Sequence, residues 1–336
     1  MRRLIATLFL IATPCLGAAD AVLRAAVDDH ILPGFETLVE KTAALETACA
    51  EACAADDAAL RAAYGEAFDA WIRVSHLRFG PTEANNLGFA LAFWPDSRGT
   101  TQKTLARLLS AEDPVIEDPE AFARASVAGR GFYALERLLY DDTLPGEAPY
   151  RRALTAAVIA DMARTASVIA TAWRDRYADT LATAGEADND VYLSADEGRR
   201  DLFTALSTGL QTTAELRLGR PLGSFERPRP KRAEARRSGR SLRHVALSLE
   251  ASRALAAILA AGAPEELRGA VDSPFARALD SAADLDDPVF AGVADPVGRI
   301  RIEALQLRVN ETRRAVALSL GPHLGIAAGF NSLDGD

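Results

Sequence analysis

Residue types that carry catalysis and metal binding are scarce in this chain of 336 residues, which has four histidines, three cysteines and two methionines. No two of the histidines, His30, His76, His244 and His323, are close enough in sequence to form a local metal pair. The chain also lacks H-E-x-x-H, G-x-S-x-G, a P-loop and a dinucleotide-binding fingerprint. The chain therefore carries none of the standard sequence signatures of zinc proteases, serine hydrolases or nucleotide-binding enzymes. Any metal site has to be assembled from residues distant in sequence.

Strand signals are nearly absent as well. Alanine and leucine dominate, β-branched clusters are few, and apolar residues recur at spacings of three and four rather than two. The pattern predicts an all-α protein with long helices. Their expected ranges are 21–52, 57–78, 100–111, 119–141, 148–183, 196–218, 238–262, 264–283 and 295–320.

The segment RPLGSFERPRPKR, residues 220–232, is rich in proline and arginine and has no helical periodicity. It is the best candidate for a domain boundary. We expect two helical bundles, an N-terminal one over residues 20–219 and a C-terminal one over 237–336, with residues 220–236 as a linker. A single larger bundle is the alternative, because such a connection can also be a crossover loop.

The first 19 residues have the order of a secretory signal peptide, with Arg2 and Arg3, an apolar run and then small residues ending near Ala19. The run is shorter than the roughly 20 residues of a membrane span, and we expect no transmembrane segment elsewhere. A lipid anchor at Cys15 is disfavoured because Pro14 precedes it. We therefore expect a periplasmic protein.

Removal of the signal peptide takes the formal charge from −9 to −11, as 36 basic residues then face 47 acidic ones. An acidic exported chain is a poor nucleic-acid binder, so nucleic acid is not an expected partner.

Cys49 and Cys53 are the cysteines of the mature chain, in a compartment that permits disulfides. Residues four apart in a regular helix hold their Cβ atoms roughly 5–6 Å apart, beyond the about 3.5–4.5 Å of a disulfide. A bridge therefore requires the helix to end near Cys53. The two alternatives, a disulfide or two small buried thiols, stay open.

The stretch AGRGFYALERLLYDD, residues 128–142, places Gly131, Tyr133 and Glu136 on one expected helix. Glu136 falls about 40° from the apolar residue Phe132 on a helical wheel, so its carboxylate is expected at the edge of the core. Such a group needs a cation, a donor or a proton. Gly131 costs roughly 1 kcal/mol against alanine inside a helix, which suggests close approach by another backbone. The stretch is either a polar pocket between helices or a structural ion pair beside a packing notch, and spacing alone favours the latter.

The sequence G-F-Y-A-L-E resembles the G-x-H-x-x-E signature of the imelysin family, exported bacterial helical proteins once proposed to be metallopeptidases and often associated with iron uptake. Four further segments are similar to the imelysin-like branch often labelled predicted periplasmic lipoproteins: DHILPGFETL (29–38), AWIRVSHLRFGP (70–81), FWPDSRG (93–99) and RSGRSLRHV (237–245). The resemblance spans most of the mature chain. It implies two helical bundles related by an ancient duplication, with the motif near the groove between them.

Tyr133 stands where the family signature has histidine, so a His/Glu metal pair at three-residue spacing cannot form. A tyrosine has an ordinary pKa of about 10 and becomes an anionic ligand only beside a strong Lewis acid or a cation. Tyr133 with Glu136 would suit ferric iron better than zinc. Iron is therefore the candidate cofactor, and zinc peptidase activity is disfavoured.

Further ligand-binding candidates come from the similar segments. His30 precedes Pro33-Gly34, which we expect to interrupt the helix, and His76 and Arg78 lie at an expected helix end. Asp96 follows a proline, and Ser241 lies in the last of the similar segments. Capping or surface exposure is the alternative explanation for each taken alone.

The segment from Glu226 to Arg243 holds eight basic residues against two acidic ones, Glu226 and Glu234. Docking onto acidic helix faces is the favoured interpretation, and an anionic ligand is the second.

Three functions remain. The first is an exported binding or accessory protein that takes a small ligand or iron chelate in a pocket around Tyr133 and Glu136, with His30 and Arg78. The second is an imelysin-type metallopeptidase in which Glu136 acts with a distant histidine, His30 or His76. The third is an interaction module with a partner protein in the cell envelope.

Overall fold

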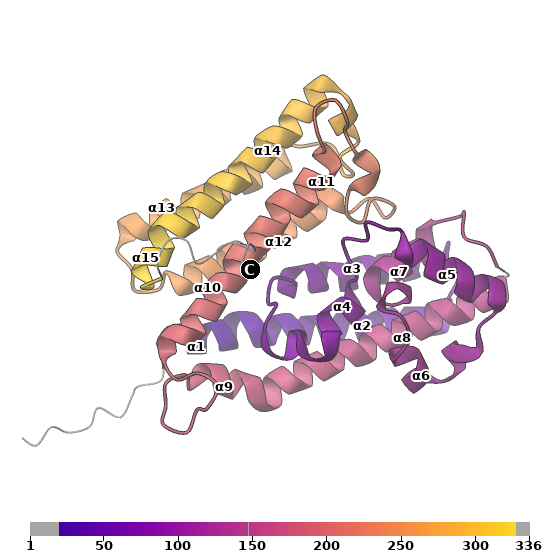
Figure 1. The fold of residues 1–336 in the computed structure, drawn as a ribbon, viewed down its shortest axis with the longest axis horizontal. Coiled ribbons are helices and arrows are strands. Elements are labelled where there is room, and N and C mark those ends of the chain that lie inside the picture. The colour runs from indigo at the N-terminus through magenta and orange to yellow at the C-terminus, as the bar shows by residue number, and fades with distance from the viewer. Residues whose placement is uncertain (1–19, 147, 327–336) are drawn as a thin grey trace, which may run out of the picture.

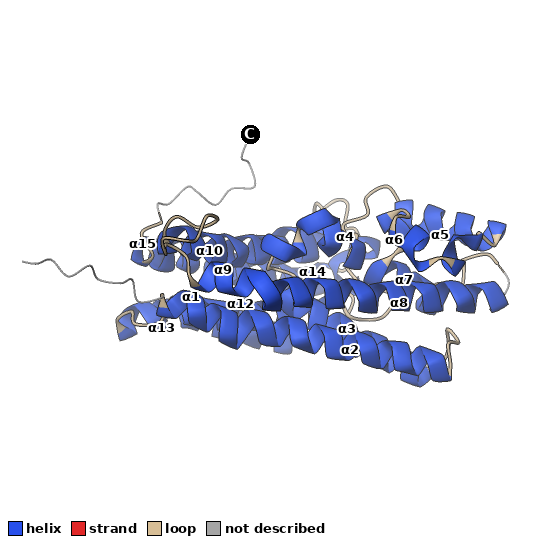
Figure 2. Cartoon of the chain, turned by 90° about the horizontal axis from the view of Figure 1, so that it is seen from below, coloured by secondary structure: helices blue, strands red, loops and turns tan. Residues whose placement is uncertain are grey.

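The computed structural model describes residues 20–146 and 148–326. The expected signal peptide, with Cys15, lies outside the described residues. Throughout the described ranges the secondary structure is helical and no strand is present, so the predicted all-α class is correct. The long helices run along one direction of an elongated molecule (Figure 2).

The N-terminal part of the chain forms one helical bundle (Figure 1). Its helices are α1 (Ala21–Ala26), α2 (Leu32–Glu51), α3 (Ala58–Val74), α4 (Leu87–Leu91), α5 (Thr100–Ala111), α6 (Pro119–Ala123), α7 (Gly131–Tyr140), α8 (Ala148–Ala172) and α9 (Ala178–Ala182). Helix α2 packs against α3 and α8, and α7 packs against α8. Large aromatic side chains such as Phe35, Trp71, Phe132 and Trp173 are fully or almost fully buried between them.

The remaining helices form the second bundle, coloured from salmon through orange to yellow in Figure 1. They are α10 (Ala195–Gln211), α11 (Gly219–Leu222), α12 (Ser241–Leu259), α13 (Glu265–Ala283), α14 (Pro296–Ala315) and α15 (Gly321–His323). Helix α10 packs against α12 and α14, and α12 also packs against α3 of the first bundle. By packing, α10 thus lies with the C-terminal helices.

Several helices are continuous through π-helical turns, which are the segments Val27–Ile31 (η1), Trp173–Tyr177 (η6), Thr212–Leu218 (η7) and Val316–Leu320 (η10). Segment η1 joins α1 to α2, so the chain is helical from Ala21 to Glu51 and Pro33 does not interrupt it. Proline lacks an N–H and would clash with the carbonyl four residues earlier in a regular helix. A π-helical turn is wider than an α-helical turn and accommodates one extra residue. Such turns recur at functional sites.

The expected helix 119–141 is instead two helices, because α6 ends at Ala123 and α7 begins at Gly131. Gly131 is therefore the first residue of α7, with a φ of +72° that favours glycine. A Cβ added there would lie 2.2 Å from the carbonyl oxygen of Leu91. Gly131 allows this close approach of two backbones, which brings α7 against the end of α4.

The helical segment from Ala148 to Ala182 is long and apolar enough to cross a membrane by length and composition alone. Of its most apolar window, 56% is buried inside the protein, where α8 packs against α2 and α7. Burial of this kind is typical of a central helix in a bundle.

Candidate functional site

A cavity of about 420 Å³ lies where the two bundles meet. Its walls come from the end of α3 and the residues after it, from the segment 89–95, from α7, from α10 with η7, from the 234 loop and from α12. The polar side chains in its lining are Ser75, His76, Arg78, Glu83, Tyr133, Thr208, Thr212, Arg217, Glu234, Ser248 and Ser252, and the aromatic ones include Trp71, Phe89 and Trp94.

Glu234 is the centre of the buried polar network at this cavity. The Tyr133 hydroxyl donates to Oε1 of Glu234, and the Arg217 Nε donates to Oε2 at 2.8 Å. His244 Nδ1 lies 3.2 Å from the same Oε2. Ser241, at the start of α12, donates its hydroxyl to the main-chain carbonyl of Glu234 and so fixes the loop. Residues from α7, η7 and α12 thus meet on one carboxylate.

The electrostatics of the network favour a carboxylate paired with a guanidinium. Burial opposes ionisation of Glu234, but the Arg217 guanidinium and the His244 ring outweigh it and lower the pKa of Glu234 to about 2. Burial lowers the pKa of His244 despite the neighbouring Glu234, so that imidazole is neutral near pH 7. Arg217 is then the counter-charge of Glu234.

Tyr133 lies in this network and not beside Glu136. Burial, followed by the charge of Glu234, raises the pKa of Tyr133 well above its ordinary value, which opposes a tyrosinate ligand. Its ring stacks on Trp94, with the ring centroids 6.1 Å apart, and meets Phe68 edge-on at 5.2 Å. The tyrosine acts here as a hydrogen-bond donor with an aromatic packing surface.

Glu136 is buried one turn further along α7 and is held by a different residue. Its Oε1 accepts hydrogen bonds from the Ser238 backbone N–H at 3.0 Å and from the Ser238 hydroxyl at 2.9 Å. Glu136 is absent from the cavity lining among the described residues. The two residues of the motif therefore hold two points of the same 234–238 loop.

The basic segment docks onto the first bundle through ion pairs. Arg237 Nε lies 3.1 Å from Asp141 Oδ2, and Arg240 and Arg243 both pair with Asp69. Gly65 on α3 leaves room for the Arg240 guanidinium, since a Cβ there would lie 2.7 Å from it. These contacts match the favoured interpretation of the segment, internal docking.

His30 and His76 are brought together by the fold although 46 residues separate them. Their Nε2 atoms lie 3.0 Å apart, with His30 on η1 and His76 just after α3. Burial lowers the pKa of His30 to about 4 and places that of His76 well below its ordinary value. Both imidazoles are neutral near pH 7, so one Nε2–H donates to the other Nε2.

Arg78 and Asp96 have different surroundings. Arg78 lines the cavity, pairs with Glu83 and places its guanidinium carbon 4.8 Å from the centroid of the Phe89 ring. Asp96 accepts from the backbone N–H groups of Thr100 and Thr101 at 2.9 and 2.8 Å, at the first turn of α5. Those bonds outweigh burial and lower the pKa of Asp96. Asp96 has the contacts of a helix cap.

Cys49 and Cys53 form a disulfide, with their Cα atoms 4.2 Å apart. Helix α2 ends at Glu51 and Ala52 adopts an extended conformation, which provides the helix end that the bridge requires.

Sequence reasoning missed three members of the Glu234 network. Arg217 gave no local signal, His244 was one isolated histidine, and Glu234 appeared only as an acidic exception within the basic segment. Its position between Arg232 and Arg236 was the available signal for a paired carboxylate.

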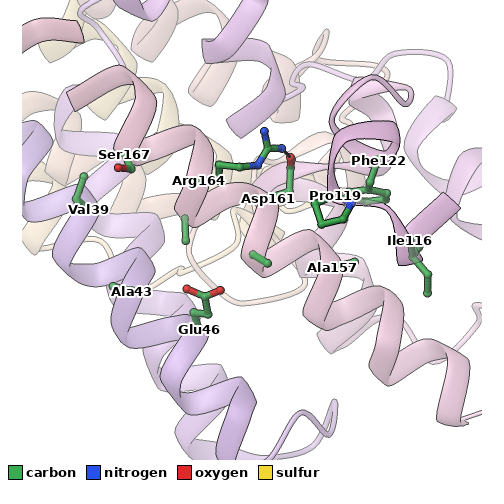
Figure 3. Close-up of a pocket in the computed structure, with 12 residues that line it drawn as sticks. Val39, Ala43, Glu46, Ile116, Pro119, Phe122, Ala157, Asp161, Arg164 and Ser167 are labelled. Carbon is green, nitrogen blue, oxygen red and sulfur yellow. Dashed lines mark hydrogen bonds and ion pairs between the residues drawn. The ribbon is translucent and has the colours of Figure 1, made fainter. Parts of the chain in front are cut away.

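A second cavity of about 510 Å³ lies between α2, α8 and the α6 region (Figure 3). Most of its lining is apolar, with Glu46 on one wall and Asp161 beside Arg164 on the other. Asp161 is already bound by Arg130, at 2.7 Å from the Arg130 Nε, and by Arg164. This cavity offers fewer convergent polar groups than the one between the bundles.

The family model of imelysin matches residues 31–316 of the chain. An imelysin-like protein from Psychrobacter arcticum 273-4 superposes with a TM-score of 0.78 at 20% identity, covering 94% of this chain and 100% of its own. A protein from Parabacteroides distasonis ATCC 8503, named an iron-regulated protein A precursor, gives a TM-score of 0.74 at 14% identity, covering 90% of this chain and 94% of its own. No curated protein matches the sequence. The two solved structures share the all-helical fold.

Proposed function

The chain belongs to the imelysin family, and on that premise we propose that it is an exported periplasmic binding or accessory protein for iron or metal-chelate acquisition. Its ligand is a small polar molecule or iron chelate that enters the cavity between the bundles. A signal-peptide pattern at the N-terminus and the name given to the structural neighbour from Parabacteroides distasonis support this proposal.

The observation that carries the proposal is the combination of fixed charges and aromatic walls in one cavity. Arg217 and Glu234 are held there almost without exposure, and Trp94 and Phe89 contribute ring surfaces. Ligand sites are typically concave and largely apolar, with a few convergent polar groups. Arg78 is partly exposed and can exchange its bond with Glu83 for an anionic group of a ligand.

Binding tests this proposal directly. Ferric citrate, haem and a ferric hydroxamate are titrated into the mature protein, with calorimetry and tryptophan fluorescence as readouts, because Trp71 and Trp94 line the cavity. Arg78→Gln should weaken binding by about tenfold through loss of one charged contact. Arg73→Gln is the matched control, since Arg73 pairs with Glu250 outside the cavity lining. Absence of binding by every probe would reject the iron function.

Localisation needs its own measurement. Fractionation of expressing cells should place the mature protein in the periplasm, with an N-terminus near residue 20 determined by mass spectrometry. A full-length cytoplasmic protein would reject the export part of the proposal. Crosslinking in the same fractions tests for an envelope partner protein.

The peptidase alternative receives less support from the site. Glu136 would have to serve as metal ligand or general base, but its Oε1 is held by Ser238. A peptide library offered with zinc, manganese or iron should therefore remain uncleaved. Cleavage that disappears with a chelator and in Glu136→Gln would restore the alternative.

A further inference from the structure

We propose that His30 and His76 together bind one divalent transition-metal ion of the copper, nickel and zinc class through their two Nε2 atoms. The proposal goes beyond the ligand of the cavity and does not depend on what that ligand is. It rests on the placement of two neutral imidazole side chains that come from separate elements, η1 and the end of α3.

The distance between the two nitrogens fits a shared metal ion. Metal–nitrogen bonds of about 2.0–2.1 Å at angles between about 90° and 109° place two imidazole nitrogens about 2.8–3.4 Å apart. The observed Nε2–Nε2 distance is 3.0 Å. Ligands on opposite sides of a metal would be about 4 Å apart. His30 and His76 therefore suit neighbouring positions on one ion and do not suit the two axial positions of a haem.

The surroundings hold the His76 side chain in place. The His30 and His76 ring centroids are 5.1 Å apart with planes tilted by 56°, and their Nε2 atoms face each other at 3.0 Å. His76 packs tightly on α10, since a Cβ on Gly209 would lie 2.7 Å from the His76 Cβ. Such fixing by packing lowers the cost of assembling a site.

Binding requires a tautomer change and no net loss of a proton. In the metal-free pair, the Nε2–H of one ring donates to the Nε2 lone pair of the other. When the ion binds, that proton leaves Nε2 and an equivalent proton is taken up at Nδ1 of the same ring through water. Both rings remain neutral, and both Nε2 lone pairs are donated to the metal.

The rest of the coordination shell is open. Among the described residues no group of three or more His, Cys, Asp or Glu side chains could hold a metal ion. The remaining positions are filled by water or by a small ligand from the cavity, which His76 also lines. The nearby cation, Arg217, is paired with Glu234. Imidazole donors suit zinc, copper and nickel, and affinity is expected to be highest for copper.

The test uses tag-free mature protein and the aqua ions Cu²⁺, Ni²⁺ and Zn²⁺. Calorimetry should give one ion per chain. His30→Ala and His76→Ala should each weaken Ni²⁺ binding by at least about tenfold. His323→Ala is the matched control, because His323 is exposed on α15, and its affinity should equal that of the wild type.

A second measurement needs no variant. Electron paramagnetic resonance of the Cu²⁺-loaded wild type should show coupling to two imidazole nitrogens. The proposal is overturned if the chain binds no ion at one-to-one stoichiometry, if folded variants lacking both imidazoles bind as the wild type does, or if the spectrum shows fewer than two nitrogens. Ferric-chelate titrations remain a separate result, so failure of either proposal is distinguishable from failure of the other.

Discussion

Tyr133 and Glu234 are 101 residues apart and meet in a hydrogen bond from the tyrosine hydroxyl to the carboxylate. The bond joins α7 of the first bundle to the loop that precedes α12 of the second. Since Glu234 is also paired with Arg217, one buried carboxylate connects three parts of the chain. Tyr133 thus has a structural partner in Glu234. Both residues line the cavity, so this part of its wall is fixed by hydrogen bonds.

Tyr133→Phe should lower the free energy of unfolding by about 1.5–3 kcal/mol, because it removes a buried hydrogen bond to a charged group. Tyr150→Phe is the control. The Tyr150 hydroxyl donates to the Asp113 carbonyl at 2.7 Å, a bond without a formal charge, so the loss should be about 0.5–1.5 kcal/mol. Urea unfolding followed by circular dichroism measures both. Equal losses would mean that the charge of Glu234 contributes nothing to the Tyr133 bond.

The low pKa of Glu234 leads us to expect that the folded protein loses stability in acid. Its pKa is about 2 in the folded chain against an ordinary value of 4.5, so the stabilisation is fully present above about pH 4.5 and is lost as pH falls toward 2. A shift of this size corresponds to stability on the order of 3 kcal/mol. Unfolding free energies measured from pH 6 to pH 2 should decline less steeply in Glu234→Gln than in the wild type. Parallel declines would contradict the low pKa.

Glu136→Gln tests the other acidic residue of the site. The substitution keeps the shape of the side chain and weakens two hydrogen bonds from Ser238, so stability should fall by about 1–3 kcal/mol. Ligand affinity should not change, because Glu136 does not line the cavity. Ser238→Ala removes one of the two donors and should cost less. Unchanged stability with lost ligand binding would instead assign Glu136 to a functional role.

Much of the fold could be predicted from local sequence. The helix 100–111 was predicted to the residue, and the helical range 148–183 ends within one residue of the observed Ala182, because periodicity and helix-ending residues act locally. The expected helix 119–141 is interrupted between Ala123 and Gly131, and Gly131, where the second helix begins, lies against the Leu91 carbonyl of another helix. That contact is tertiary and has no signature in the neighbouring residues.

The candidate site was predictable only in part. Tyr133 and Arg78 line one cavity together with His76, whereas Glu136 and His30, the other members of the expected pocket, are not among its lining residues. Asp96 has the contacts of a helix cap, and Ser241 holds a loop. The His30–His76 pair could not be predicted, since its two members are 46 residues apart and meet only through the packing of α2 against α3.

Two glycines with a positive φ, Gly131 and Gly239, separate two costs of replacing Gly131 by alanine. One cost is backbone strain, and the other is steric collision of the added Cβ. Gly131 and Gly239 have nearly equal φ values, +72° and +73°. An added Cβ meets the Leu91 carbonyl at 2.2 Å at Gly131, whereas nothing lies within 4 Å at Gly239. Gly239→Ala should therefore cost about 1–2 kcal/mol from the left-handed conformation alone. Gly131→Ala should cost more than about 4 kcal/mol, because the backbones of α7 and α4 must also move apart. Thermal and urea unfolding of the two variants give the comparison. If both lose the same stability, backbone contact at Leu91 is not what selects glycine at position 131.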